Sequence, residues 1–420
     1  MSRFVVRATG PLSGTVHARG AKNAVLKEMA ACLLAEGMHR LRNVPRNTDV
    51  ETMASVLRAL GCRVHWADDH ELSIGVPTAT RLETDAPAAH VARLRASIVV
   101  LGPLLARHGE ARLPLPGGDD FGTRPVNFHL EGLGAMGADV RVHRGVIEAS
   151  TPPPGRLHGA RITLEYPSHT ATDNLLMASV TAEGTTVLDN AAREPEVEDL
   201  CTMLNAMGAR ITGLGTSRLV IEGVDELRPA DHEVVTDRLV AATCLAAAAI
   251  TGGEVTVADA RPEHMETLLR KLQTIGCDLS TSSGVTAKGP ARPSPCDVAT
   301  LPYPGVATDY KPLLVAVLSV ADGTSVVTEN LFEGRFRYVE ELSRMGAEVS
   351  TEGHHVVIHG VERLVGAQVR ATDVRAGAAL VLAGLVADGV TEVANAAHVD
   401  RGYEDLPGLL GALGADVRRA

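Results

Sequence analysis

The sequence predicts an α/β protein of two domains, each made of three similar repeats of roughly 70 residues. The first observation is a short segment of the form apolar-Gly-small-polar-apolar that occurs six times, with its glycine at positions 61, 137, 208, 276, 346 and 414. The second is a segment rich in Ala, Leu and Val that ends at a glycine and passes into a β-branched run, with glycines at positions 37, 109, 184, 253, 323 and 389. A chain of 420 residues is too long for one ordinary core, so three repeats are expected in each domain.

Each repeat has the pattern helix, strand, helix, strand, with further strands before the next copy. The glycine that ends each Ala/Leu-rich segment is a helix C-cap signal, and a following run such as Thr185–Leu188 is typical of a strand. An amphipathic helix then leads into the next glycine turn, as in Val197–Met207. The Ala/Leu-rich helix is apolar on all sides, so it is expected to be buried all round. The pattern therefore predicts helices inside each domain and sheets outside.

Composition limits the class of protein. The formal net charge of -11 argues against general nucleic-acid binding, and 45% hydrophobic with 22% charged residues is typical of a globular chain. The six cysteines form no Cys-x-x-Cys pair and show no metal-ligand spacing, so we expect reduced, mostly buried thiols, no metal site and no organic cofactor. The first residues form no apolar signal segment and the longest apolar runs are too short to span a bilayer. A cytoplasmic protein without a membrane partner, monomeric or weakly homo-oligomeric, is expected.

The loop at residues 115–125 differs from the rest of the chain. Its eleven residues hold three glycines and two prolines together with Asp119, Asp120 and Arg124, and no other repeat has such an insertion. Glycines in the middle and prolines at the rims predict a lid that brings proton-transfer and anion-binding groups to a substrate. An ordinary surface loop is the alternative. Asp120 either raises the pKa of Asp119 or faces water.

The six Ala/Leu-rich helices are each expected to begin at polar or charged residues and to face one cleft between the domains. Asp and Ser are good N-caps, so capping and surface ion pairs are one interpretation. Cations oppose the helix dipole at an N-terminus, so a polyanionic ligand is the other interpretation of the basic residues among them. The six segments begin at Lys22, Arg95, Ser168–His169, Asp237–Arg238, Thr308–Lys311 and Asp373–Arg375, and Arg401 adds a cation on a glycine-flanked loop.

These motifs resemble the enolpyruvyl transferase family over the whole chain. In that family the fold is two inside-out α/β barrel domains of three repeats each, which agrees with the repeat count. The resemblance implies that residues 1–21 and 233–420 form the catalytic barrel and residues 22–232 the barrel that carries the lid loop. The matching motifs are Gly20–Asn23, Arg95–Ser97, Leu115–Gly118, Arg124–Val126, Asn190–Pro195, Thr308–Asp309, Arg335–Phe336, Asp373–Arg375 and Asp400–Tyr403.

The resemblance implies transfer of the enolpyruvyl group of phosphoenolpyruvate to a sugar hydroxyl of a uridine nucleotide, with release of phosphate. The expected acceptor is the 3-hydroxyl of UDP-N-acetylglucosamine, in the first committed step of peptidoglycan precursor synthesis. The shikimate-pathway branch is disfavoured because the Arg124–Val126 and Asn190–Pro195 blocks belong to the uridine-nucleotide branch. Addition to an enol ether needs a proton at one carbon and a nucleophile at its neighbour, and elimination then expels phosphate, so acids switch roles while arginines hold the anion.

The resemblance also implies residue roles. Asp309 would take the acceptor hydroxyl proton, Asp373 would assist proton handling at the vinyl carbon, and Asp119 would be the acid on the lid. Lys22, Arg124 and Arg401 would bind the phosphate and carboxylate of phosphoenolpyruvate. The remaining implied substrate contacts are Asn23, Arg95, Pro125, Val126, Asn127, Ser168, His169, Leu331, Arg335 and Arg375, with Arg124–Asn127 beside the uracil and Arg95, Ser168 and Arg335 along the nucleotide.

Departures from the family pattern cluster near the acceptor. Asp119 stands where Cys is most common, which predicts insensitivity to fosfomycin because capture of that drug needs a thiolate. His169, Asn127 and the Ala307–Lys311 segment replace the usual residues, and His169 is either a phosphate contact or a plain polar loop residue. A paralogue that acts on UMP or a related nucleotide in nucleoside-antibiotic biosynthesis is the alternative. A non-enzymatic scaffold is disfavoured, since it has no need for Lys22 or Asp309 in one repeat only.

Overall fold

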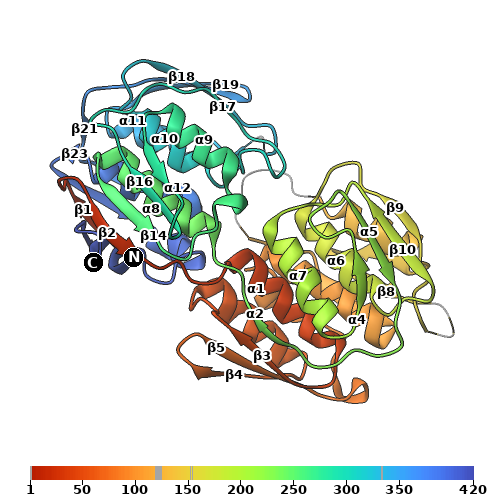
Figure 1. The fold of residues 1–420 in the computed structure, drawn as a ribbon. Coiled ribbons are helices and arrows are strands. Elements are labelled where there is room, and N and C mark those ends of the chain that lie inside the picture. The colour runs from red at the N-terminus through yellow and green to blue at the C-terminus, as the bar shows by residue number, and fades with distance from the viewer. Residues whose placement is uncertain (1, 119–124, 152, 154, 333) are drawn as a thin grey trace. The chain divides into compact units, whose positions relative to one another are not determined.

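The computed structural model of the chain describes residues 2–118, 125–151, 153, 155–332 and 334–420. The described chain divides into two compact units. Domain A comprises residues 20–118 and 125–235, and domain B comprises residues 2–19 and 236–420. Both are built in the same way, with helices on the inside and small sheets on the outside (Figure 1).

Domain A contains three sheets around its helices. Their strand orders are β13-β3-β5-β4, β6-β8-β7 and β11-β12-β10-β9. The helices are α1 (Lys22–Ala31), α2 (Thr48–Ala59), α3 (Ala88–Val91), α4 (Leu101–His108), α5 (Asn127–Ala135), α6 (His169–Ser179) and α7 (Pro195–Ala206). The strands are β3 (Gly37–Arg42), β4 (Arg63–Asp68), β5 (Glu71–Val76), β6 (Glu110–Pro114), β7 (Asp139–His143), β8 (Val146–Ser150), β9 (Arg161–Thr163), β10 (Thr185–Asp189), β11 (Arg210–Thr212), β12 (Arg218–Glu222) and β13 (Asp231–Glu233).

Domain B repeats this plan with the orders β2-β14-β16-β15, β17-β18-β20-β19 and β22-β24-β1-β25, and adds the short pair β21-β23. Its helices are α8 (Arg238–Thr251), α9 (Glu266–Thr274), α10 (Lys311–Leu318), α11 (Tyr338–Arg344), α12 (Val374–Gly384) and α13 (Leu406–Gly411). Its strands are β1 (Arg3–Arg7), β2 (Ser13–Val16), β14 (Glu254–Val257), β15 (Asp278–Ser280), β16 (Val285–Lys288), β17 (Val298–Ala299), β18 (Thr324–Thr328), β19 (Glu348–Glu352), β20 (His355–His359), β21 (Leu364–Val365), β22 (Gln368–Arg370), β23 (Ala387–Asp388), β24 (Val390–Ala394) and β25 (Asp416–Arg419).

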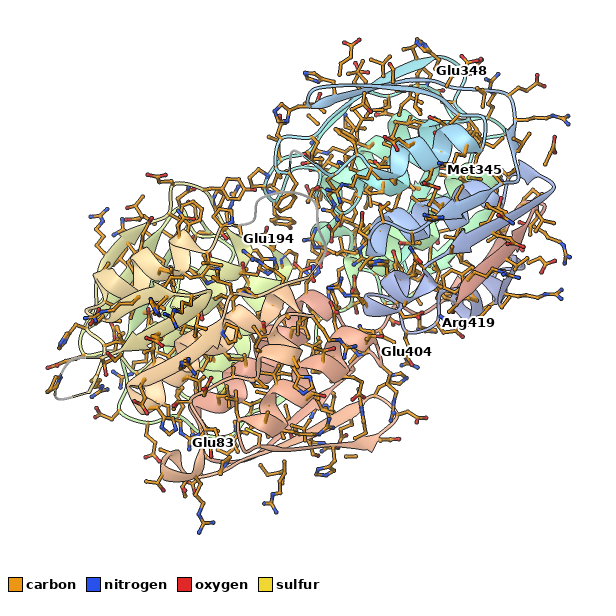
Figure 2. All side chains as sticks on the ribbon, turned by 180° about the vertical axis from the view of Figure 1, so that it is seen from behind. Glu83, Glu194, Met345, Glu348, Glu404 and Arg419 are labelled. Carbon is orange, nitrogen blue, oxygen red and sulfur yellow. The ribbon has the colours of Figure 1, made fainter. Side chains whose placement is uncertain are left out.

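The Ala/Leu-rich helices are the inner ones, as predicted. Every residue of α10 and α12 is buried, and α6 is buried from Ala171 to Ser179. The outer layer, in contrast, has one buried and one exposed side. In domain B, Met345 at the end of α11 is buried, whereas Glu348 in β19 is exposed at the surface (Figure 2). The second inner helix departs from expectation, because Arg95 begins a 3-10 segment, η3 (Arg95–Val100), that continues into α4.

The backbone conformation explains why glycine recurs after the outer helices. The six glycines that follow the outer helices all have positive φ, between 85° at Gly346 and 110° at Gly208. This conformation is open to glycine and costly for residues with a Cβ. The predicted turns are therefore confirmed. The expected glycine C-caps of the inner helices hold at Gly109, and in the fourth repeat at Gly252, one residue before the expected Gly253. They were wrong in the other four repeats, where the C-caps are Ala35, Val180, Ser319 and Leu385 and the expected glycine follows later.

The N-terminus completes the sixth repeat. β1 pairs antiparallel with both β24 and β25, and β2 pairs parallel with β14. Domain A is closed in a comparable way, because β13 at its end pairs parallel with β3 at its start. In five of the six larger sheets another strand pairs parallel with the first strand of the repeat, whereas the β6-β8-β7 sheet has only the parallel bridge Asp85–Arg112 at that place in the described chain.

No helix in the described part of the chain has both the length and the apolar character needed to cross a bilayer.

Candidate active site

Each of the three inner helices of domain B begins just after an aspartate. The helices are α8, α10 and α12, and the aspartates are Asp237, Asp309 and Asp373. Asp373 caps α12, because its Oδ1 accepts from the amides of Arg375 at 2.9 Å and Ala376 at 3.0 Å. Asp237 caps α8 in the same way. No side chain caps α10, which begins directly after Asp309 and Tyr310. Capping by a carboxylate offsets the positive end of the dipole, so it accounts for two of these acids.

Asp309 is held between two arginines. Arg335 Nη2 donates to its Oδ1 at 2.6 Å, and Arg375 Nε lies 3.6 Å from its Oδ2. The Asp309 side chain is 24% exposed, whereas those of Arg335 and Arg375 are 4% and 2% exposed. The structure thus brings three predicted site residues together around one carboxylate that solvent, and hence a substrate, can reach.

A buried ion pair, Lys311–Glu329, is linked by hydrogen bonds to the group of Asp309 and its two arginines. Lys311 Nζ lies 2.8 Å from Glu329 Oε2, and both side chains are fully buried. Thr308 Oγ1 donates to Glu329 at 2.7 Å and accepts from Arg335 Nη1 at 3.0 Å, so the pair is linked to the Asp309 group. Burial lowers the pKa of Lys311 to about 8, although the Glu329 carboxylate acts to raise it. The sequence did not single out Glu329, which lies in no matched motif.

Other predicted residues of domain B lie on neighbouring segments. Leu331 donates its backbone amide to Glu329 Oε1 at 2.8 Å. Arg401 is half-buried at the end of η5 (Ala396–Arg401). The next residue, Gly402, packs so closely on α12 that an added Cβ would lie 2.4 Å from Val374 Cγ1. The segment that carries Arg401 therefore lies against the first turn of α12.

Lys22 stands at the start of α1 in domain A. Its Nζ donates to Asp49 Oδ2 at 3.1 Å, and the Lys22 side chain is 14% exposed. No side chain caps α1, and its first turn holds no acid. An uncapped helix N-terminus beside an ammonium group is suited to bind an anion. The adjacent Asn23 is half-buried.

Arg95 forms hydrogen bonds with both ends of the 115–125 loop. Its Nη1 donates to the carbonyl of Pro116 at 3.2 Å and its Nη2 to that of Pro125 at 3.3 Å. Gly117 packs so tightly that a Cβ would lie 1.8 Å from the carbonyl oxygen of Ala92. Asp119, Asp120 and Arg124 lie outside the described residues, so the lid remains a prediction.

Beyond the loop, Val126 packs against the core of domain A and Asn127 begins α5. The Asn127 amide donates to Glu131 Oε1 at 3.4 Å, which is one helical turn away. The two residues thus lie at the start of α5, and their expected contact with the uracil stays a prediction.

The third inner helix begins with Ser168 and His169. Ser168 caps α6, because its Oγ accepts from the amide of Ala171 at 3.5 Å. His169 Nε2 lies 3.3 Å from Lys27 Nζ and 3.4 Å from Asp173 Oδ2. Burial raises the pKa of Asp173 to about 7, although the Lys27 ammonium acts to lower it. His169 is thus part of a charged group and is not an isolated loop residue.

Lys27 and Asp173 were missed by the sequence analysis. Both are almost fully buried, and their charged atoms are 3.5 Å apart. A signal was present, since a lysine inside an Ala/Leu-rich helix needs a buried partner.

Lys22, Arg95, Arg238 and Arg375 together were expected to indicate a polyanionic ligand, and for two of them this expectation was wrong. Arg238 is 6% exposed and donates to Tyr310 OH at 3.2 Å. Arg375 pairs with Asp309 and lies over the Tyr403 ring at 5.0 Å. These two cations have partners inside the protein, so their presence alone does not require a ligand. Lys22 and Arg95 remain the cations at helix starts that no side chain caps.

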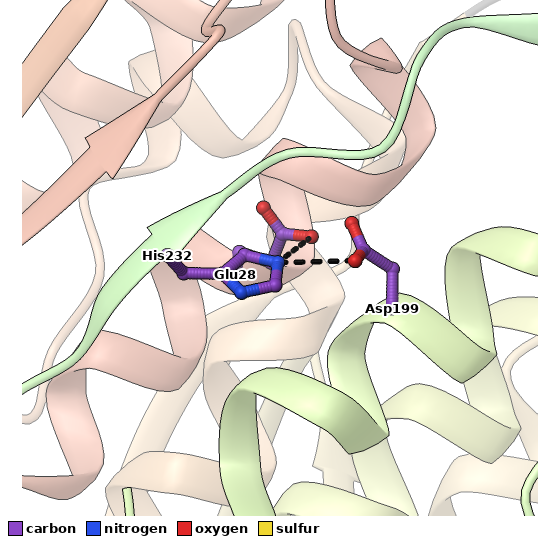
Figure 3. Close-up of side chains that lie close together, drawn as sticks. All are labelled: Glu28, Asp199 and His232. Carbon is purple, nitrogen blue, oxygen red and sulfur yellow. Dashed lines mark hydrogen bonds and ion pairs between the residues drawn. The ribbon is translucent and has the colours of Figure 1, made fainter. Parts of the chain in front are cut away.

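A separate acidic group lies in domain A, where Glu28, Asp199 and His232 come together (Figure 3). The sequence indicated no metal site, because these residues are far apart along the chain and belong to no spacing motif. All six cysteines are buried.

The fold and these side chains define an α/β enzyme with cations and carboxylates at the starts of buried helices, and comparison with known proteins gives its family. A family model described as EPSP synthase (3-phosphoshikimate 1-carboxyvinyltransferase) matches residues 6–410. Two relatives, the UDP-N-acetylglucosamine 1-carboxyvinyltransferases of Corynebacterium jeikeium and Nocardia farcinica, are each 49% identical and cover 99% of this chain and 98% of their own. The structure of the enolpyruvyl transferase NikO from Streptomyces tendae matches with a TM-score of 0.87 at 26% identity, over 100% of this chain and 99% of that chain.

The chain belongs to the EPSP synthase family and is an enolpyruvyl transferase. The expected resemblance and the expected two-domain inside-out α/β fold are both confirmed.

Proposed function

We propose that the chain transfers the enolpyruvyl group of phosphoenolpyruvate to the 3-hydroxyl of UDP-N-acetylglucosamine in the cytoplasm, releasing phosphate for peptidoglycan precursor synthesis. The observation that carries this proposal is the 49% identity, over nearly the whole of both chains, to enzymes named for that reaction. The match to these relatives covers both domains, the helix starts and the 115–125 loop, so the inference about the acceptor rests on nearly the whole chain.

Asp309 is proposed as the base that takes the acceptor hydroxyl proton. The partial exposure of its side chain supports this role, and the two guanidiniums that contact it fix its orientation. A general base must lie within hydrogen-bond reach of the proton that it removes. Asp373 is proposed to assist at the vinyl carbon while its Oδ1 caps α12.

The anionic groups of the substrates are assigned to the cations. Lys22, Arg124 and Arg401 are proposed to hold phosphoenolpyruvate, supported by the uncapped start of α1 beside Lys22. Buried or fixed cations stabilise the negative charge on the leaving phosphate without reorganising in the transition state. Asp119 is proposed as the acid of the lid. Asn23, Arg95, Pro125–Asn127, Ser168, His169, Leu331, Arg335 and Arg375 are proposed nucleotide or substrate contacts.

A second acceptor, UMP or a related uridine monophosphate, is favoured by one observation. His169 and Lys27 place two basic side chains together at the start of α6, where the nucleotide phosphates are proposed to lie. A monophosphate concentrates its charge on one group, and the partly exposed His169 is proposed to contact it, whereas Lys27 is buried and paired with Asp173.

The test is phosphate release from phosphoenolpyruvate with UDP-N-acetylglucosamine and UMP offered in parallel. We expect release with UDP-N-acetylglucosamine at a kcat/KM at least 100-fold above that with UMP, a range typical of recognition that leaves buried polar groups unpaired with the wrong substrate. Release with UMP alone would reject the proposed acceptor and keep the transferase activity. No release with either would reject both acceptors.

Insensitivity to fosfomycin is predicted under either acceptor. Asp119 replaces the thiol that the drug captures, and burial raises the pKa of each of the six thiols, which makes them poor nucleophiles. Preincubation with micromolar drug should leave activity unchanged over time, whereas Asp119→Cys should become inactivated progressively. Time-dependent loss in the unaltered protein would contradict the prediction.

A further inference from the structure

Three segments of domain A bring metal-binding side chains to one point (Figure 3). Glu28 comes from the inner helix α1, Asp199 from the outer helix α7, and His232 from the closing strand β13. His232 Nε2 lies 3.1 Å from Asp199 Oδ1 and 3.7 Å from Glu28 Oε1, and the three donor atoms all lie within 4.8 Å of one another.

Glu28 lacks the hydrogen bonds that a buried carboxylate needs. Its side chain is 0% exposed, and neither of its oxygens accepts a hydrogen bond from any residue that the structure describes. Lys27, the preceding residue, forms its ion pair with Asp173 and lies 3.3 Å from His169 Nε2. A buried carboxyl group of this kind binds either a proton or a cation.

We propose that Glu28, Asp199 and His232 form a binding site for a divalent cation of the zinc class in domain A. Four ligands at the 2.0–2.2 Å typical of zinc stand roughly 3.3 Å apart, and the 3.1 and 3.7 Å separations at His232 lie on either side of that value. One imidazole with two carboxylates suits Zn²⁺ or Mn²⁺ better than Mg²⁺ or Ca²⁺, which prefer oxygen ligands alone.

The surroundings fit a metal site in two further ways. Asp199 Oδ2 accepts from the amide of Val235 at 2.8 Å, which fixes the carboxylate as outer hydrogen bonds fix metal ligands elsewhere. His232 and Asp199 are 11% and 13% exposed, so a cation and its remaining water ligand can enter from their side. The bound cation would tie the closing strand to α1 and α7.

The experiment uses the full chain without an affinity tag, stripped with a chelator and titrated with Zn²⁺ by calorimetry. We expect binding of one ion, and at least tenfold weaker binding in Glu28→Gln and in His232→Ala. Co²⁺ should give visible absorption bands from a site with a nitrogen ligand. The matched control is His17→Ala, which removes an exposed His–Asp pair with an Nδ1–Oδ2 distance of 2.6 Å in domain B. That variant should bind Zn²⁺ like the unaltered chain.

Thermal unfolding gives a second measurement that does not depend on the fold of the variants. Zn²⁺ should raise the Tm of the unaltered chain by several degrees while Mg²⁺ does not, because a ligand that binds only the folded state stabilises it. Glu28→Gln removes a like-charge contact, so its metal-free Tm should stay equal or rise, and Zn²⁺ should no longer shift it. Absence of stoichiometric binding, or binding unchanged by Glu28→Gln, would overturn the proposal and leave Glu28 as a protonated group bonded to Asp199.

Discussion

At the scale of single residues, two arginines hold the accessible carboxylate of Asp309 in a fixed orientation. Arg335 binds one oxygen at 2.6 Å, while Arg375 lies 3.6 Å from the other. Charge-assisted hydrogen bonds of this kind fix geometry as well as charge. The acid and both arginines were expected as site residues, but the contacts among them follow only from the packing of three separate segments.

Replacing Asp309 by Asn should lower kcat about 10²–10⁴-fold with a smaller change in the KM for phosphoenolpyruvate, because the amide cannot accept the hydroxyl proton. The assay is phosphate release at saturating acceptor. Asp322→Asn is the control, since Asp322 forms an exposed ion pair with Arg292 at 3.1 Å in the same domain. A kcat for Asp309→Asn equal to that of the control would exclude Asp309 as the base.

Asp173 should make stability depend on pH. Burial raises its folded pKa to about 7 from an ordinary 3.8, so the folded chain holds this proton between those values and the unfolded chain does not. Its contribution is therefore fully present below about pH 4 and is lost as the pH rises through 7. Asp173→Asn should gain, relative to the unaltered chain, about 1–3 kcal/mol between pH 5 and pH 8.

The measurement is denaturant unfolding at both pH values. Asp225→Asn serves as the control, because Asp225 is 97% exposed and should show no such pH difference. An equal effect of Asp173→Asn at pH 5 and pH 8 would mean that Asp173 stays ionised throughout.

At the scale of elements, the 115–125 loop is set by close contacts at its rims. Gly117 approaches Ala92, and Arg95 joins Pro116 to Pro125. A Cβ at Gly117 cannot fit without a shift of the backbone that carries Asp119, the proposed acid. Moving a reacting group by about 1 Å costs about 100-fold in rate.

Gly117→Ala should therefore lower kcat/KM by tenfold or more while leaving the Tm within a few degrees. The matched control is Gly134→Ala in α5, where an added Cβ meets nothing within 4 Å. That variant should keep full activity and gain stability, since alanine is the better helix former. Equal kinetics in the two variants would show that the rim does not position the loop.

Element positions were more predictable from sequence than element contacts. Glycine turns and Ala/Leu-rich helices leave local signals, because positive φ and all-round burial restrict residue type at each position. The Glu28, Asp199 and His232 group leaves none. Its members meet because of how α1 and α7 are rotated about their axes in the packed domain, and no spacing along the chain encodes that rotation.

At the scale of the whole molecule, the six-repeat pattern predicted sheets outside the helices and three repeats in each of two domains. The pattern did not show that the last repeat takes β1 from the other end of the chain, since residues 3–16 carry neither glycine signature. The family resemblance supplied only the expectation that residues 1–21 belong to the same domain as residues 233–420. At 26% identity the match to NikO with a TM-score of 0.87 shows how far sequence can change while this arrangement persists.

Deleting residues 2–7 should prevent domain B from folding, because β1 is the strand between β24 and β25. A circular permutant that joins Ala420 to Ser2 and opens the exposed turn at 282–283 should fold, since the amide of Arg3 donates to the carbonyl of Ala420 at 3.1 Å. Circular dichroism and cooperative thermal unfolding distinguish the two. A cooperative, native-like melt of the deletion variant would show that the strand is dispensable.

The position of β1 also sets an order of events on the ribosome. Residues 3–7 are synthesised long before their partners in β24 and β25, which begin at residue 390. At 5–20 residues per second, this strand waits roughly 20–80 s for its neighbours. Phe4 and Val6, which are 0% exposed in the finished domain, lack their partners in β24 and β25 during that time. Domain A can be completed within the interval, because all its strands precede β24 in the chain.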